Sequence, residues 1–312
     1  MAKSLALYAV DLEGDGFIDL AVANDTVQNF LFHNQGDGTF QEIGMEAGIA
    51  FNFDGQSTGA MGIDGGYHRN SQALAIGIGN FANEMSSLYV SQEDPTWFAD
   101  ESIGEGIGSP SRLVLSFGLF FFDYDLDGRL DLLQANGHLE EEINQIQASQ
   151  HYEQATQLFW NQGPEQDSCF VEVPAGTVGD LSRPIVGRGA AYGDIDGDGD
   201  LDVVLTQTGR APLLLRNDQQ LGHHWIRVRL RGTKANRDGI GAWVEVSAGG
   251  VTQRRPVMPT RSYLSQVELP VTIGLGMNQS IDALIVIWPD GSRQEVASPP
   301  VDREIEVVQE GG

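Results

Sequence analysis

The sequence has 312 residues, enough for two domains or one large one, and its 18 basic against 44 acidic side chains give a formal net charge of −26. This acidic excess excludes nucleic acid and anionic membrane surfaces as ligands, because lysine and arginine bind both. The only cysteine, Cys169, excludes a disulfide framework, and the longest apolar run, residues 113–122, is too short to span a bilayer. The 39 glycines and the recurrent Asp-Gly and Asn-Gly pairs indicate many short strands joined by tight turns.

The first predicted unit is a strand at residues 8–10, an acidic loop at residues 11–19 and a strand at residues 20–23. The same order recurs around the acidic loops at residues 123–131 and 194–202. A worn copy lies between the first two, and we expect its former acidic positions to hold these residues: Gly66, His68, Asn70 and Leu74. The copies lie about 55 to 71 residues apart, a spacing typical of propeller blades with several short strands each.

The longest interval between copies contains residues 139–157, which are rich in Glu and Gln and predict an inserted loop or short helix. Beyond residue 220 the pattern changes to the strands of a smaller unit. We expect these strands at residues 224–231, 242–247, 281–288, 293–296 and 303–308. The sequence therefore predicts an all-β protein, with propeller-type repeats at residues 1–220 and a small β-domain at residues 221–312. Three arginines of the first of these strands either form a solvated face or dock on the acidic propeller: Arg227, Arg229 and Arg231.

The three acidic loops share the pattern Asp-x-[Asp/Glu]-x-Asp-Gly-x-x-Asp, which suits calcium. Side chains at positions one, three and five turn towards one centre, the glycine gives the sharp turn, and the carbonyl of position seven and the acid of position nine complete the shell. Calcium takes about six to eight oxygen ligands, and carboxylates this close repel one another without a cation. We predict about three mainly structural calcium ions, held by Asp11, Glu13, Asp15, Phe17, Asp19, Asp123, Asp125, Asp127, Arg129, Asp131, Asp194, Asp196, Asp198, Asp200 and Asp202.

Other interpretations of these loops fit less well. An EF-hand needs a glutamate at the twelfth position, where the three loops have Val22, Gln134 and Leu205, and no helices flank them. A metal-free turn rich in aspartate and glycine explains one copy better than three copies in register. Magnesium prefers fewer protein ligands. We expect no metal in the worn copy near Asn70.

The chain resembles the FG-GAP/VCBS repeats of integrin α-subunit propellers and, more closely, the cartilage acidic protein family with its C-terminal ASPIC/UnbV domain. In the repeats the resemblance rests on three motifs: Phe121-Phe-Asp-Tyr-Asp-Leu-Asp-Gly128, Asn136-Gly-His138 and Gln157-Leu-Phe-Trp-Asn161. In the C-terminal unit it rests on five more: His224-Trp225, the segment 232–241, Tyr263-Leu-Ser-Gln266, Gly274-Leu-Gly276 and Trp288-Pro-Asp-Gly291. The resemblance implies a seven-bladed propeller, calcium in the acidic loops, an extracellular location and roles in adhesion or protein interaction. It implies no catalytic activity, and the roughly four repeats present are too few for a closed ring.

Enzyme interpretations find little support in the sequence. The segment 55–59 matches the nucleophile elbow Gly-x-Ser-x-Gly around Ser57, but the strand before it and the helix after it are missing, so we expect a turn residue. His138 lacks a ligand cluster, and we expect it to hydrogen-bond backbone in a loop. Every acidic cluster that the sequence places already belongs to a calcium loop. We predict no catalytic residue and no cofactor except calcium.

Three functional hypotheses remain. The first is an extracellular or periplasmic adhesion or interaction module that binds protein or glycan ligands. The second is an enzyme or biosynthetic accessory protein with a pocket at the propeller face or the domain junction. The third is a structural subunit that self-associates through open blade edges. Since no signal peptide is visible and the first loop begins at Asp11, we also expect that the chain belongs to a longer polypeptide or pairs its exposed edges with another copy.

Overall fold

Four antiparallel sheets follow one another along the chain, and the strands of each pair in sequence order. We call them blades 1 to 4. The computed structural model describes residues 2–311. The strands of blades 1 and 2 are β1 (Ser4–Val10), β2 (Asp19–Asn24), β3 (Phe30–Asn34), β4 (Phe40–Glu42), β5 (Ile63–Gly66), β6 (Ala75–Ile78), β7 (Ser87–Ser91) and β8 (Phe98–Asp100). Those of blades 3 and 4 are β9 (Ser116–Phe122), β10 (Asp131–Asn136), β11 (Gln157–Asn161), β12 (Phe170–Glu172), β13 (Gly187–Gly193), β14 (Asp202–Gln207) and β15 (Leu213–Leu215).

The blades stack face to face, with their first strands innermost. Strand β5 contacts β1 and β9, and β9 contacts β13. Every residue of β9 is buried, because neighbouring blades cover both faces of its sheet, and the strand is therefore a nearly continuous apolar run. In β1 the burial alternates, with Tyr8 and Val10 buried but Leu7 44% exposed, since no blade covers the outer face of blade 1. This stacking of meanders confirms the all-β, propeller-type prediction, whereas the seven-bladed ring stays a prediction.

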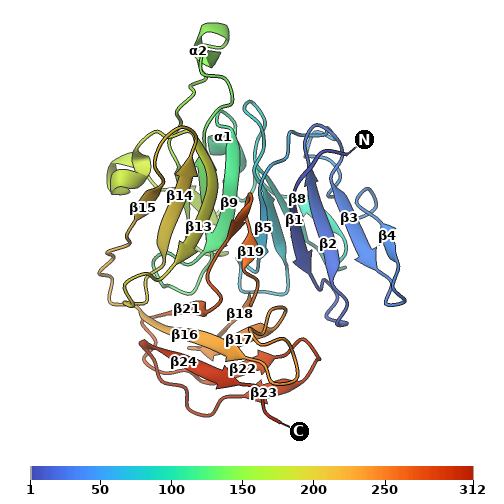
Figure 1. Ribbon diagram of the computed structural model, residues 1–312, viewed down its shortest axis with the longest axis vertical. Helices are drawn as coiled ribbons and strands as arrows, with labels where there is room; N and C mark the ends of the chain where they lie inside the picture. Colours follow the sequence, from blue (N-terminus) through green and yellow to red (C-terminus); the bar gives the residue numbers. More distant parts are fainter. Residues whose placement is uncertain (1, 312) are drawn as a thin grey trace.

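The C-terminal part forms two sheets that lie beneath the blades in Figure 1. One sheet has the order β21-β16-β24 and the other β18-β17-β22-β23. Their strands are β16 (His224–Arg231), β17 (Trp243–Ala248), β18 (Val251–Pro256), β21 (Val271–Gly276), β22 (Ala283–Ile287), β23 (Arg293–Glu295) and β24 (Arg303–Val308). Apolar residues from both sheets, among them Val228, Val244 and Val286, form one buried core.

A short hairpin of this C-terminal part, β19 (Thr260–Arg261) and β20 (Ser265–Gln266), lies among the innermost strands of the blades (Figure 1). The Ser262 N–H donates to the Ile63 carbonyl of blade 2 at 3.0 Å, and its hydroxyl accepts from the Leu119 N–H of blade 3 at 2.9 Å. The Ser265 hydroxyl accepts from the Ala190 N–H of blade 4 at 3.2 Å. The hairpin therefore occupies the centre around which the blades are arranged.

Helices are few and short: α1 (Gly108–Ser111), α2 (Ile143–Ile146), and the 3-10 turns η1 (Ala175–Thr177) and η2 (Gly179–Ser182). Helix α2 lies in residues 139–157 and confirms the predicted insertion, and no helix among the described residues is long and apolar enough to cross a membrane. The C-terminal strands β16 and β24 have the predicted bounds. Strand β18 was not predicted, because its residues Gln253, Arg254 and Arg255 break the apolar alternation that marks a strand.

Candidate metal centre

Each acidic loop connects the first two strands of a blade, and one carboxylate sets its frame. We call residues 11–19, 123–131 and 194–202 loop 1, loop 3 and loop 4. The aspartate at position nine opens the second strand and pairs with the last residue of the first. One of its carboxylate oxygens accepts a backbone N–H from the loop itself. The other accepts, at 2.8 Å in each loop, the backbone N–H of an asparagine that ends the third strand or follows it. The donors are Leu12 and Asn34 to Asp19, Tyr124 and Asn161 to Asp131, and Ile195 and Asn217 to Asp202. The position-nine acids are thus fixed by the fold and keep further lone pairs for a cation.

The first aspartates of loop 1 and loop 3 differ in their hydrogen bonds. Asp11 accepts N–H groups of Gly14 and Gly16 on its two oxygens at 2.7 and 2.8 Å, so the loop backbone satisfies it. Asp123 accepts only the Gly128 N–H, at 2.9 Å, on Oδ2. Its Oδ1 atom is buried and has no hydrogen-bond partner among residues 2–311. A buried, unpaired carboxylate oxygen is costly unless something absent from the protein chain pairs with it.

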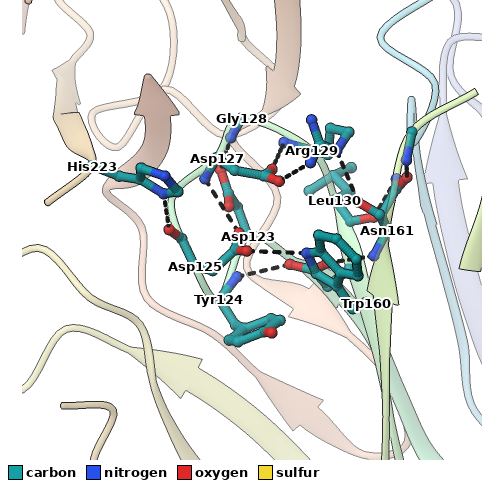
Figure 2. A network of polar contacts seen from close by, with 12 residues as sticks. Asp123, Tyr124, Asp125, Asp127, Gly128, Arg129, Leu130, Trp160, Asn161 and His223 are labelled. Carbon is teal, nitrogen blue, oxygen red and sulfur yellow. Dashed lines mark hydrogen bonds and ion pairs between the residues drawn. The ribbon is translucent and has the colours of Figure 1, made fainter. Parts of the chain in front are cut away.

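Loop 3 brings three carboxylates together. Oxygen atoms of Asp123, Asp125 and Asp127 lie within 4.8 Å of one another, and Asp123 and Asp125 are only 2% and 5% exposed (Figure 2). The Trp160 indole N–H donates to Asp125 Oδ2 at 3.0 Å, and the guanidinium of Arg129 pairs with Asp127 Oδ2. Burial, followed by the charges of Asp127 and Asp125, raises the pKa of Asp123 well above its usual range. Burial and the charge of Asp125 raise the pKa of Asp127 to about 6. These acids therefore repel one another in the absence of a cation.

Loop 4 forms a similar but more open group. Oxygens of Asp194, Asp196 and Asp202 lie within 4.8 Å of one another. The Asp200 side chain is not part of this group, and its Oδ1 accepts the Gln219 side-chain N–H at 2.7 Å. Burial raises the pKa of Asp200 to about 6. The fifth-position acid, Asp198, accepts the backbone N–H of Asp200.

Loop 1 is exposed, and its acids are not among the three clusters found in the described residues. The His33 ring lies between Glu13 Oε2, 3.4 Å from Nε2, and Asp19 Oδ1, 3.0 Å from Nδ1. Asp15 accepts only the Phe17 N–H two residues on, and the Phe17 side chain is 43% exposed. The structure thus brings three of the predicted carboxylates together in loop 3, without Asp131, and three in loop 4, without Asp198. The predicted calcium ligand sets stay a prediction.

The worn copy in blade 2 requires a correction of one residue. Gly66 pairs with Ala75 as Phe122 pairs with Asp131, so the loop starts at Tyr67 and not at Gly66. The predicted register was wrong because the glycine pair before Tyr67 resembles a turn but continues the strand. In the corrected register positions one, three, five and nine hold these residues: Tyr67, Arg69, Ser71 and Ala75. Arg69 pairs with Glu101 and Glu105, so a fixed guanidinium stands where the other loops have their third-position acid.

One further cluster had no sequence signal, because its members come from two blades. His68 Nε2 lies 3.3 Å from Glu105 Oε2. The Cys169 sulfur, a His68 ring nitrogen and a Glu105 carboxylate oxygen lie within 4.8 Å of one another. Burial raises the pKa of the Cys169 thiol to about 12, which leaves it protonated and unreactive at neutral pH.

The C-terminal part covers loop 3. The Gly276 N–H donates to the Leu126 carbonyl at 2.9 Å, and the Arg255 guanidinium donates to the Gly128 carbonyl at 3.1 Å. A Cβ on Gly274 would lie 2.3 Å from Asp123 Oδ2, so only glycine permits this approach. Burial lowers the pKa of Arg255 to about 10. In the sequence, Gly274 and Gly276 stand out only as part of a family motif, and no local pattern singles out Arg255.

Loop 4 is covered by the same part of the chain. The Trp225 ring packs on Gly199 so closely that any side chain there would overlap it. Arg227, which is buried, places its guanidinium 3.5 Å from Asp194 Oδ2 and pairs with Glu268 and Glu304. Of the two alternatives for the arginine stripe, Arg227 therefore docks on the propeller, while Arg229 and Arg231 are exposed.

The two residues weighed as catalytic lie apart from these loops. Ser57 is exposed in irregular chain, with no helix in residues 51–62. His138 is buried, and its Nδ1 accepts the Glu140 N–H at 3.0 Å, as predicted for a loop histidine. Burial lowers its pKa.

Comparison with known proteins gives a consistent result. Residues 232–312 match the family model described as ASPIC and UnbV. The chain is 27% identical over 300 residues to cartilage acidic protein 1 of Homo sapiens, covering 93% of this chain and 42% of the relative. The protein of the same name from Xenopus tropicalis is 28% identical over 280 residues, covering 88% of this chain and 40% of the relative. The chain thus spans less than half the length of the curated relatives that it matches.

Solved structures are more distant. A GH32 beta-fructofuranosidase of Bombyx mori superposes with a TM-score of 0.37 and 12% identity, covering 96% of this chain and 75% of that one. An exo-beta-1,3-galactanase of Phanerochaete chrysosporium gives a TM-score of 0.27 at 12% identity, covering 89% and 64%. Similarities this weak carry no argument about chemistry. The family model and the curated relatives show that this chain has an ASPIC/UnbV domain at its C-terminal end and is similar along most of its length to cartilage acidic protein 1.

Proposed function

We propose that this chain is an extracellular, calcium-binding interaction module in which calcium stabilises the junction between blade 3 and the C-terminal domain. The observation that carries the proposal is the buried, unpaired Oδ1 of Asp123, a residue whose carboxylate lies close to two further carboxylates in loop 3. Oxygen-only donors at this spacing suit a hard cation such as calcium. The relatives' name places them in cartilage, an extracellular matrix, and names no reaction.

Charge balance supports a cation in loop 3. The loop contributes four buried or nearly buried carboxylates: Asp123, Asp125, Asp127 and Asp131. Arg129 pairs with Asp127, and the charge of Arg255 acts on Asp123, so these two arginines offset only part of the charge of the four carboxylates. A divalent cation would offset this repulsion and satisfy Asp123 Oδ1.

The three loops are not equivalent under this proposal. Loop 3 would bind calcium most tightly, since it is buried and assembled. Loop 4 would follow, because Arg227 already offsets part of the charge of Asp194. Loop 1 would bind weakest, since it is exposed and its acids do not form a cluster in the described residues.

Calorimetric titration of the chelated protein tests the proposal. We expect at least two calcium sites of different affinity and a rise in melting temperature, because a ligand that binds only the folded state stabilises it by mass action. An unchanged melting curve in excess chelator and in excess calcium would refute the proposal.

The second hypothesis, an enzyme or accessory protein, keeps one specific observation in its favour. A cavity of about 730 Å³ lies between blades 3 and 4 and is lined by Leu158, Val178 and Leu215 among other apolar residues. Its lining combines apolar side chains with polar ones, such as Asp180 and Asn217, and we identify no nucleophile with an adjacent base among the described residues that line it.

A further inference from the structure

Blades 1, 2 and 3 each have four strands, whereas blade 4 has three. After β15 the chain leaves the blade and enters the C-terminal domain at β16. The fourth-strand position of blade 4 is therefore unfilled by any described residue. Strand β15 ends the sheet, and among the described residues no backbone group pairs with its outer edge.

The three outer strands that are present share a sequence. They read Phe-Gln-Glu in β4, Phe-Ala-Asp in β8 and Phe-Val-Glu in β12. In each, the phenylalanine pairs with the last residue of the third strand, and the acid pairs with the residue two positions earlier. The equivalent residues of blade 4 are Asn217 and Leu215, because Leu215 pairs with Val203 as Phe159 pairs with Leu132.

The phenylalanine fills a pocket that the preceding blade supplies. Phe98 and Phe170 are 2% and 1% exposed, and Phe170 shares a buried cluster with Leu88 and Ile107 of blade 2 and its linker. Phe40 belongs to blade 1, which has no preceding blade, and it is 47% exposed. A phenylalanine in blade 4 would enter the space between blades 3 and 4.

That space is the 730 Å³ cavity. Its lining includes Leu158, which holds the place in blade 3 that Leu88 holds in blade 2, because each pairs with the third residue of its own second strand. It also includes Val178 and Leu181, which follow β12 as Ile107 follows β8. Asn217 and Leu215 line it from the blade 4 side.

A glycine in each linker marks where the outer strand passes. Gly48 and Gly106 have φ of +81° and +90°, and a Cβ on them would lie 2.3 and 2.2 Å from the carbonyl oxygens of Phe98 and Phe170. The linker before blade 4 has Gly179, with φ of +55°, but no atom lies within 4 Å of its Cβ position. The linker before blade 4 thus has a glycine that would let an outer strand pass close to it, but no outer strand of the described residues lies there.

We propose that blade 4 binds an extended Phe-x-Asp/Glu segment of a partner protein as its fourth strand, antiparallel to β15, with the phenylalanine in the cavity beside Leu158 and Gly179. The inference rests on the proposed interaction role and names the partner's chemistry. Strand addition of this kind takes affinity from main-chain hydrogen bonds and specificity from the pocket. The outward C=O of Leu214 would accept a backbone N–H of the segment, as the Leu31 carbonyl accepts the Ile43 N–H in blade 1. The outward N–H of Leu214 would donate to the acidic side chain of the segment, as the Leu31 N–H donates to the Glu42 carboxylate.

The probe is a synthetic peptide with the sequence of residues 38–44, which includes β4, flanked by one lysine at each end and labelled for fluorescence anisotropy. The full chain is titrated in calcium. We expect saturable binding, weakened about tenfold or more by replacing the phenylalanine of the peptide with alanine. Equal binding of the two peptides, or no binding, would overturn the proposal.

Two variants locate the site on the protein. Gly179→Asn adds a side chain at a positive-φ position that asparagine tolerates and where space is now open, so the fold should survive while the strand is blocked. Gly209→Asn is the matched control, since Gly209 has φ of +71° and open surroundings and lies between β14 and β15 of blade 4. We expect about a tenfold loss of binding in the first and none in the second. Equal binding by both variants would contradict the assignment.

Two further readouts separate this inference from its alternatives. Light scattering of the chain alone would reveal a dimer that Gly179→Asn dissociates if a second copy occupied the site, and that result would overturn the partner assignment. The calcium-induced rise in melting temperature is measured on the same samples. Its persistence without peptide binding would refute only the docking site, whereas its absence would refute the proposed function.

Discussion

Loop 1 and loop 3 have the same nine-residue pattern, the same position-nine aspartate hydrogen bonds and the same left-handed glycine at position six, with φ of +89° at Gly16 and +93° at Gly128. They differ in what surrounds them. Loop 1 is exposed and its first aspartate is satisfied by loop backbone, whereas loop 3 is buried under the C-terminal domain with Asp123 Oδ1 unpaired. The repeat pattern thus builds the turn, while residues more than a hundred positions away determine whether its carboxylates are buried.

The largest effect should come from breaking the cover of loop 3. Gly274→Val would place a side chain against Asp123 and Leu126, and we expect it to lower the free energy of unfolding by about 3 kcal/mol. Denaturant unfolding in calcium measures this. Gly176→Ala, in a linker with open surroundings, is the control and should change stability by less than about 0.5 kcal/mol. Similar losses in both variants would mean that the contact at loop 3 has no special weight.

Removing one acid from each loop sharpens the comparison. At calcium about 100 times its dissociation constant, binding adds about 2.7 kcal/mol to stability. Asp127→Asn should lose most of this gain, and in chelator it should be neutral or stabilising because it relieves repulsion. Asp15→Asn, at the same position of loop 1, should retain the gain. Thermal melts with and without calcium measure this gain in each variant. An equal loss of the calcium-induced gain in the two variants would contradict the difference between the loops.

The pH dependence in chelator should also single out loop 3. The folded-state pKa of Asp127, about 6, lies above that of an unfolded aspartate, so the folded protein retains this proton at a pH where the unfolded chain has lost it. Its contribution to stability is present below about pH 4 and is lost as the pH rises through 6. We expect Asp127→Asn to flatten the fall in melting temperature between pH 4 and 7, as does saturating calcium. A slope unchanged in this variant would contradict the assignment.

The smallest effect belongs to loop 1. His33→Gln removes a ring that lies between Glu13 and Asp19 near the surface, and partly exposed ion pairs contribute about 0 to 1 kcal/mol. The melting temperature in calcium should hardly change. A loss as large as that of Asp127→Asn would show that loop 1 carries more of the stability than its exposure suggests.

Much of this architecture could be predicted from local pattern. Alternating or continuous apolar runs around the Asp-Gly turns predicted the first two strands of three blades, and alternation predicted the bounds of β16. The bounds of β24, expected as the strand that closes the C-terminal unit, were also correct. The glycine at position six was predictable too, since only a residue tolerant of positive φ closes so sharp a turn.

What could not be predicted depends on contacts distant in sequence. Nothing in residues 123–131 says that Gly274 and Arg255 will cover them, and nothing in residues 11–19 says that they will stay exposed. The worn copy was misaligned by one residue because only strand pairing distinguishes Gly66 from a turn. The missing fourth strand of blade 4 became visible only when four sheets could be compared.

The central claim is that loop 3, sealed by the C-terminal domain, is the strongest calcium site of the chain. The most direct test is an anomalous difference map from crystals grown at limiting calcium, with occupancy refined at all three loops. We expect the highest peak among Asp123, Asp125 and Asp127, a lower one at loop 4 and the weakest at loop 1. A highest peak at loop 1, or no peak beside Asp123 Oδ1, would contradict it.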